Sequence, residues 1–212
     1  MPLVITYSKQ LEKKRIKNTF KKLSWYDELG YRPRFPKDVN PRADDLKDVY
    51  SALDSEYEEK DYQEFANKTS NEFSKIEHSF FEKLQKICGK RIRRNFNLIL
   101  TKYGVGGSYF PPNKIIYNIA MKNTPINSIL HEIVHLTIEK YIQKYNIQQN
   151  EKERIVDLIL SSNPIALPNY QMQERGEVHR DIIDPLFKEY FNPPIDIFFK
   201  KFMELKKKKE LC

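Results

Sequence analysis

The stretch His131-Glu132-Ile133-Val134-His135 lies at the centre of a strongly apolar segment of this 212-residue chain. Successive residues of an α-helix are rotated by about 100° around its axis, so histidines four positions apart lie one turn apart on nearly the same face. Both imidazoles can therefore reach a single metal ion. The glutamate between them leans toward the same side, where it can hold a water without crowding the metal. The stretch predicts a metal site built on one helix.

The residues around this stretch predict that its helix is long and buried. Thr124 and Pro125 are typical of a helix start, with a capping hydroxyl followed by proline at the first helical position. From there to about Tyr145, apolar residues cover most of the helix circumference. Polar side chains on a buried helix cost free energy unless they find partners. A metal ion would supply a partner for the two histidines.

The segment before this helix predicts a small sheet. Residues 95–101 and 114–119 are rich in apolar and β-branched residues, and each predicts a strand. Between them lies the glycine-rich stretch Gly106-Gly107-Ser108-Tyr109. Glycine in a strand is typical of a sheet edge or of a close approach between backbones. A glycine-rich hairpin without a function fits the composition equally well.

The two histidines leave the third metal ligand open. A catalytic zinc ion takes three protein ligands and keeps one position for water. The best candidates are acidic and lie on a second helix predicted to begin near Asn150. Glu153 and Asp157 share an apolar face of that helix, where carboxylates are unusual unless they are paired or bound to metal. Glu151 is expected to point the other way into solvent, and His179 is a more remote alternative.

A His-Glu-x-x-His helix followed by a helix with Glu-x-x-x-Asp resembles the gluzincins, the thermolysin-like zinc metallopeptidases, and the compact minigluzincins. The resemblance implies that His131, His135 and Glu153 bind Zn²⁺. It also implies that Glu132 is the general base and that Asp157 orients His131 from behind. Seventeen residues separate His135 from Glu153, slightly fewer than in thermolysin, so the connection between the two helices must be tight.

The resemblance covers residues 95–162 and implies a substrate site as well. Zincins place a strand, an antiparallel edge strand and another strand before the active-site helix, and they bind extended peptides along that edge. Here the substrate edge strand would be formed by Gly106, Gly107, Ser108 and Tyr109. Gluzincins also use a Tyr or His donor to stabilise the oxyanion of the reaction. This chain offers His179, which we expect to be catalytic, and Tyr170.

Composition predicts an α+β protein that is mainly helical. The hydrophobic content is 40% and there are only six glycines. We expect a helical N-terminal region over residues 1–89 and a zincin-like catalytic region over residues 90–212, ending in a helix from about Pro194. Within the N-terminal region we expect a basic helix over about residues 9–23, an irregular stretch over residues 24–33 and two helices over residues 42–86.

The net charge of +8 leaves a second class of function open. The excess of lysine and arginine lies mostly near the two ends of the chain, over residues 13–22 and 206–209. Such runs are more often solvated helix faces than nucleic-acid sites, and no interleaved aromatic residues of an RNA-binding kind accompany them. The alternative to a peptidase acting on a peptide or protein substrate is a nucleic-acid-associated protein with a structural or regulatory zinc site. A degenerate, non-catalytic zincin is a third possibility.

Glu132 argues against a structural zinc site, which would be closed by four ligands and would need no glutamate between the histidines. The two cysteines, Cys88 and Cys212, form no disulfide framework in a chain of this length. The apolar N-terminus is too short for a signal peptide, and no window is long enough for a membrane span. We therefore expect a cytoplasmic protein without a membrane partner.

Overall fold

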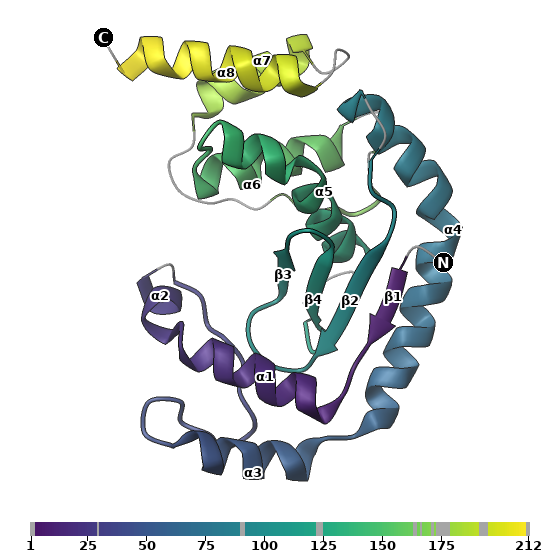
Figure 1. The fold of residues 1–212 in the computed structure, drawn as a ribbon, viewed down its shortest axis with the longest axis vertical. Helices are drawn as coiled ribbons and strands as arrows, with labels where there is room; N and C mark the ends of the chain where they lie inside the picture. Colours follow the sequence, from purple (N-terminus) through teal and green to yellow (C-terminus); the bar gives the residue numbers. More distant parts are fainter. Residues whose placement is uncertain are drawn as a thin grey trace. The chain divides into compact units, whose positions relative to one another are not determined.

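A computed structural model describes residues 3–28, 30–89, 92–121, 125–162, 165, 167–170, 172, 179–190 and 195–210. Of the described residues 63% are helical, and a small mixed sheet of four strands accompanies the helices (Figure 1). This confirms the predicted mainly helical α+β composition. The contacts of the chain divide it into two units, Met1–Phe73 with Asn95–Ile129 and Ser74–Arg94 with Leu130–Cys212. These units alternate along the sequence, so they differ from the regions predicted on either side of residue 89.

The sheet belongs to the first unit and has the order β1-β2-β4-β3. Its strands are β1 (Leu3–Thr6), β2 (Phe96–Thr101), β3 (Gly107–Phe110) and β4 (Lys114–Asn118). The two predicted strands, β2 and β4, pair in parallel, and β3 runs antiparallel to β4 at one end of the sheet. The strand β1 was not predicted. It pairs in parallel with β2 and completes the sheet on the other side.

One face of the sheet is apolar because buried side chains alternate along its two central strands. Leu98 on β2 is paired with Ile115 on β4, and Leu100 is paired with Tyr117. All four side chains are buried. Side chains of a strand alternate between the two faces of its sheet, so these two pairs stand on the same face.

The first unit also contains helices. They are α1 (Lys9–Phe20), α2 (Leu23–Glu28), α3 (Leu46–Glu56) and the part of α4 (Glu59–Cys88) that ends at Phe73. The prediction of an irregular stretch over residues 24–33 was wrong where α2 forms. Tyr26 is buried there, and Gly30, with φ of 70°, provides the left-handed turn that ends the helix. The backbone N–H of Tyr31 then bonds the carbonyl of Tyr26 at 2.8 Å.

Glu12 of α1 is a fully buried acid in the first unit. Its Oε1 accepts hydrogen bonds from the Tyr62 hydroxyl and from the backbone N–H of Lys102, each at 2.5 Å. Among the described residues its Oε2 has no hydrogen-bond partner. Burial raises the pKa of Glu12 from 4.5 to about 7 and outweighs the opposing effect of these two bonds.

We expect this burial to make the protein less stable as the pH rises. In the unfolded chain Glu12 ionises near pH 4.5, whereas in the folded protein it holds its proton to about pH 7. The stability that Glu12 contributes is therefore complete below pH 4.5 and is lost as the pH rises through about 7. The loss is about 3 kcal/mol of folding free energy. The variant Glu12→Gln lacks this titration. Melting temperatures measured from about pH 5 to pH 8 should therefore fall more for the wild type, and parallel profiles would refute the assignment.

The second unit contains the remaining helices that the structure describes. These are the rest of α4, most of α5 (Pro125–Lys144), α6 (Gln149–Ser161), α7 (Arg180–Tyr190) and α8 (Ile195–Glu210). The bounds of α5 and the start of α8 follow the prediction closely, whereas α7 was not predicted. Thr124 and Cys212 lie outside the described residues. None of the helices described is both long enough and apolar enough to cross a membrane.

The start of α6 differs from the prediction by two residues. Gln148, not a residue near Asn150, is the N-cap. Its backbone N–H donates to the Glu151 carboxylate at 2.9 Å, which forms a capping box. The buried face of this helix carries both apolar side chains and Glu153 and Asp157, as the sequence pattern had indicated.

Candidate metal centre

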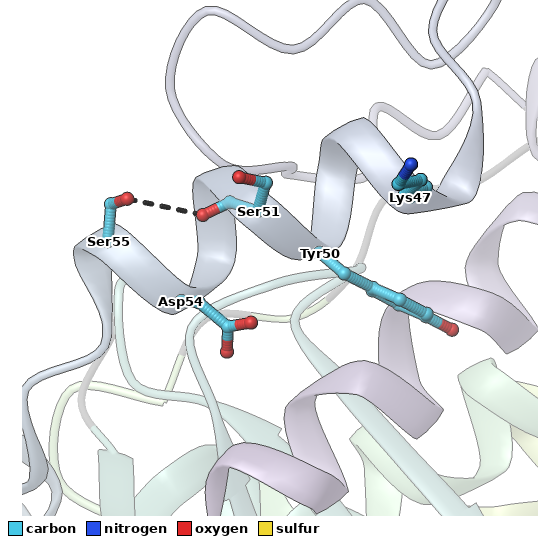
Figure 2. A pocket seen from close by; sticks show the side chains of 5 residues that line it. All are labelled: Lys47, Tyr50, Ser51, Asp54 and Ser55. Carbon is cyan, nitrogen blue, oxygen red and sulfur yellow. Dashed lines mark hydrogen bonds between the residues drawn. The ribbon is translucent and has the colours of Figure 1, made fainter.

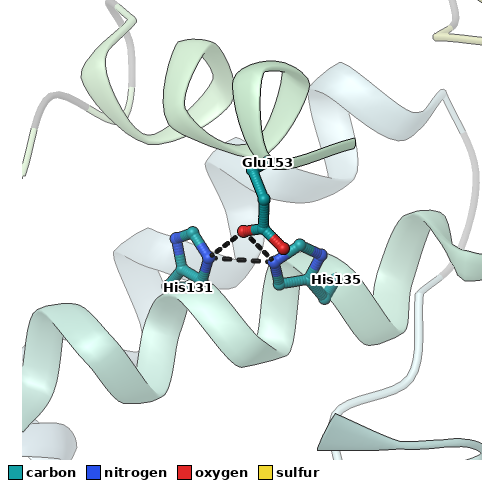
Figure 3. Close-up of side chains that lie close together, drawn as sticks. All are labelled: His131, His135 and Glu153. Carbon is teal, nitrogen blue, oxygen red and sulfur yellow. Dashed lines mark hydrogen bonds and ion pairs between the residues drawn. The ribbon is translucent and has the colours of Figure 1, made fainter. Parts of the chain in front are cut away.

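His131 and His135 of α5 and Glu153 of α6 form one buried cluster in the second unit (Figure 3). The Nε2 atoms of the two histidines are 2.9 Å apart. The Oε2 atom of Glu153 lies 3.1 Å from each of them. The structure thus brings together the three side chains proposed as ligands, and it presents one atom from each to a common point.

The spacing of these three atoms suits a metal ion. Zinc binds imidazole nitrogen and carboxylate oxygen at about 2.0–2.1 Å, so two ligand atoms of a tetrahedral site are separated by about 3.3 Å. The observed 2.9–3.1 Å is slightly shorter, and small side-chain rotations would cover the difference. The cluster can hold a metal ion, and its nitrogen and oxygen donors fit several divalent metals.

Hydrogen bonding fixes which oxygen of Glu153 faces the histidines. Its Oε1 atom accepts a hydrogen bond from the side-chain amide of Gln149 at 2.6 Å. This leaves Oε2 as the oxygen that lies between His131 and His135. Glu153 is therefore arranged to offer a single ligand atom.

Burial and mutual contact shift the pKa values of all three side chains. Burial lowers the pKa of His135 to about 4, so its imidazole is neutral at pH 7. Burial would raise the pKa of Glu153, but its bonds to the two histidines outweigh burial and lower it. Burial also acts to lower the pKa of His131, but the hydrogen bond to Glu153 and the nearby carboxylates outweigh it and raise this pKa. The cluster thus supplies an ionised carboxylate and a neutral imidazole, which are the forms that bind metal.

Glu132 lies between the two histidines on α5 and is buried, with 8% of its surface exposed. Its charge is close enough to His131 to raise the pKa of that histidine. Burying a charge costs free energy, so buried ionisable side chains are common at functional sites. It is therefore the candidate proton acceptor of the site.

A tyrosine that the sequence did not identify in this role lies behind His131. The Tyr170 hydroxyl is 2.8 Å from Nδ1 of His131 and donates to Oδ1 of Asp157 at 2.5 Å. The hydrogen bond predicted between Asp157 and His131 is not made directly, since Oδ1 of Asp157 and Nδ1 of His131 are 3.9 Å apart. The hydroxyl of Tyr170 links them instead. Tyr170 was expected only as an oxyanion donor, and its hydroxyl is engaged elsewhere.

This chain of contacts selects one tautomer of His131. Asp157 is fully buried and accepts a hydrogen bond from the Tyr170 hydroxyl, so the Tyr170 oxygen can in turn accept one from Nδ1–H of His131. Nδ1 then carries the ring proton, and the lone pair of Nε2 points to Glu153 and His135. The arrangement orients a ligand histidine through a partner beyond the metal.

Glu151 is not solvated, and that prediction was wrong. Its side chain is 3% exposed. Besides capping α6, it accepts hydrogen bonds from the ammonium group of Lys206 at 2.8 Å and lies 2.9 Å from Nδ1 of His179. Lys206 belongs to α8, so the charge of Glu151 is balanced by a residue 55 positions away. The sequence of α6 alone gives no sign of this partner.

His179, predicted to be catalytic or a remote ligand, contacts this buried acid. It is absent from the three-ligand cluster found among the described residues. Its side chain is about one-third exposed, and the imidazole is directed to Glu151. The structure therefore assigns His179 a structural partner in the second unit.

The predicted substrate strand lies at the edge of the sheet, and it belongs to the first unit. Of Gly106, Gly107, Ser108 and Tyr109, the last three lie within β3, which in the described sheet pairs only with β4. Gly106 precedes the strand, and its carbonyl accepts from the backbone N–H of Asn118 at 2.9 Å. In the described sheet, β3 is thus an edge strand.

A surface pocket also lies on the first unit, along α3 (Figure 2). Its lining residues are Lys47, Tyr50, Ser51, Asp54 and Ser55. Asp54 is paired with Lys13 at 2.8 Å, and the Ser55 hydroxyl donates to the carbonyl of Ser51 at 3.2 Å. The pocket contains none of the predicted site residues.

Comparison of the chain with known protein families, with curated proteins and with solved structures returns no match. The functional interpretation therefore depends on the residues themselves.

Proposed function

We propose that this protein is a zinc-dependent metallopeptidase of the gluzincin type. The observation that carries the proposal is the convergence of His131, His135 and Glu153 on one point, with Glu132 between the histidines on the same helix. Three ligands from two helices are the set of a catalytic zinc site, which keeps a position open. A structural site would require a fourth ligand, and the described residues offer a cluster of only three.

Each residue of the site has a distinct part in the proposed reaction. Zinc bound there would polarise the scissile carbonyl and lower the pKa of the attacking water. His131, His135 and Glu153 would hold the ion. Tyr170 would keep His131 in the tautomer in which Nε2 carries no proton and can bind the metal. Glu132 would take a proton from the attacking water and later deliver it to the leaving amine. The bond cleaved is the peptide C–N bond, and the products are a carboxylate and an amine.

The resemblance to the gluzincins favours a peptide substrate over a small amide, because those enzymes bind an extended chain through main-chain hydrogen bonds. Recognition of this kind depends little on side chains, so it would accept a range of sequences. The proposed substrate is an extended segment of a peptide or protein.

The function is tested by metal-dependent cleavage. Protein freed of metal with a chelator, and the same protein reloaded with zinc, are incubated with casein and with a mixed peptide library, and products are identified by mass spectrometry. Cleavage that requires zinc and that is lost in Glu132→Gln supports the proposal. Stoichiometric zinc binding with no cleavage of any substrate would indicate a non-catalytic metal site.

Tyr170 should contribute to metal affinity although it touches no metal. The variant Tyr170→Phe removes the hydroxyl that links Asp157 to His131, so Nδ1 of His131 loses its acceptor and the ring loses its fixed tautomer. We expect zinc affinity to fall about 10- to 100-fold, the usual effect of such partners. Competition with a chromophoric chelator measures this change.

A matched control is Tyr145→Phe, at the residue that directly follows α5. The Tyr145 hydroxyl donates to Asp196 at 3.4 Å and has no contact with the cluster in the described structure. Its removal should leave zinc affinity unchanged. Equal affinities for the wild type and both variants would show that Tyr170 does not position His131.

A further inference from the structure

The exposed side of α1 carries a row of lysines. Lys14, Lys17 and Lys21 are exposed and are spaced by three and four positions, which places them on one face. Lys21 continues the helical backbone as the C-cap residue. None of the three has an ion-pair partner among the residues that the structure describes. Their charges therefore remain available to an external anion.

An aromatic pair follows this row directly. Trp25 of α2 is 46% exposed, which is high for a side chain of its size. Its ring stacks on Tyr31, with centroids 6.0 Å apart and planes 18° from parallel. The ammonium group of Lys22 lies 5.7 Å from the centre of the Trp25 ring. An aromatic surface and a cation are thus adjacent on the same exposed segment.

The charge of the surrounding sequence is mainly positive. Residues 14–37 contain eight basic residues and two acidic ones. Of the two acids, Asp27 is paired with Arg42 at 2.5 Å. We call the exposed surface formed by Lys14, Lys17, Lys21, Lys22 and Trp25 the basic aromatic face. It would attract a polyanion.

We propose that the basic aromatic face binds single-stranded nucleic acid. Proteins that bind single strands without sequence preference combine lysines that follow the phosphates with aromatic rings on which bases stack. Both elements are present here, and Lys22, which directly follows Lys21 in the sequence, contacts the Trp25 ring. The sequence alone does not indicate that two aromatic rings stack here. Tyr31 contacts Trp25 only because the chain reverses at Gly30.

An anionic membrane is the competing partner for such a surface, and the structure favours it less. A helix that lies on a membrane buries an apolar face in the lipid boundary. The apolar residue Ile16 of α1 is instead fully buried in the protein. Trp25 is the large apolar side chain left exposed on the basic aromatic face. The proposal is independent of the metal centre, which lies in the other unit.

The test uses the full-length protein and a fluorescent 20-nucleotide oligodeoxythymidine, with binding followed by anisotropy over a range of salt concentrations. The triple variant Lys14→Gln, Lys17→Gln, Lys21→Gln should weaken binding and reduce the salt slope by about 2, since each phosphate contact to a single strand contributes roughly 0.7. Trp25→Ala should weaken binding roughly 5- to 150-fold without changing the salt slope, because it removes stacking only.

The matched control removes the same charge elsewhere. Lys60, Lys68 and Lys75 are exposed lysines of α4, and their replacement by glutamine should change binding only slightly. Every substituted side chain is exposed, and circular dichroism checks that the variants fold. Equal losses in the two triple variants would overturn the proposal, because net charge alone would then explain binding. So would Trp25→Ala with wild-type affinity, or binding to phosphatidylserine vesicles but not to the oligonucleotide.

Discussion

Replacing Glu132 by glutamine is expected to abolish peptide hydrolysis and to leave the metal bound. The substitution keeps the size of the side chain and removes its ability to accept a proton. Glu132 is not among the three clustered ligand side chains, so zinc content should not change. Loss of a general base slows a reaction by about 10²- to 10⁴-fold. The measurement compares cleavage rates of the wild type and the variant at equal zinc content.

A second glutamate of the same helix provides the control. Glu139 also lies on α5, and its carboxylate accepts a hydrogen bond from Gln143 at 2.9 Å. The variant Glu139→Gln should cleave at the wild-type rate. If Glu132→Gln also retained that rate, Glu132 would not be the base, and another group would have to accept the proton.

The second large effect is expected at Glu153. Glu153→Ala removes the oxygen that lies 3.1 Å from both histidines, and it leaves two imidazoles to hold the ion. Zinc affinity should fall by more than the 10- to 100-fold expected for Asp157→Ala, which acts on His131 only through Tyr170. Titration of zinc against a competing chelator ranks the two variants with the wild type.

The variant Glu151→Ala distinguishes the loss of a metal ligand from a loss of folding stability. Glu151 lies two residues from Glu153, but it pairs with Lys206 and caps α6. Glu151→Ala leaves the buried ammonium group without its partner and should cost about 3 kcal/mol of folding stability. The folded fraction should still bind zinc with wild-type affinity. A larger loss of zinc affinity in Glu151→Ala than in Glu153→Ala would show that the ligand has been assigned to the wrong residue.

The predictable part of the site is the part that repeats with the helical period. The spacing of His131 and His135 and the shared face of Glu153 and Asp157 follow from 3.6 residues per turn. The apolar residues around them locate both helices, and α5 and α6 begin and end close to the predicted positions. Local periodicity therefore identified three clustered side chains before any tertiary contact was known.

The unpredicted part depends on contacts between distant segments. Tyr170 follows α6 in a stretch with no periodic pattern, so its place between Asp157 and His131 had no local signal. Glu151 was assigned to solvent because Lys206, its partner, lies on another helix. In the fold, β1 has four residues and α2 has six, which is too short for a period to be recognised.

The position of β1 also constrains the order in which the chain can fold. Leu3 pairs with Phe96, so this parallel pairing closes a loop of about 90 residues, and the entropy of closure must be paid before the strand gains its hydrogen bonds. On the ribosome, β1 must wait until β2 has emerged. During that interval β1 lacks its partner strand, and its backbone groups are open to pairing with other chains. Of the four strands in the sheet, the one synthesised earliest therefore waits longest for its partner.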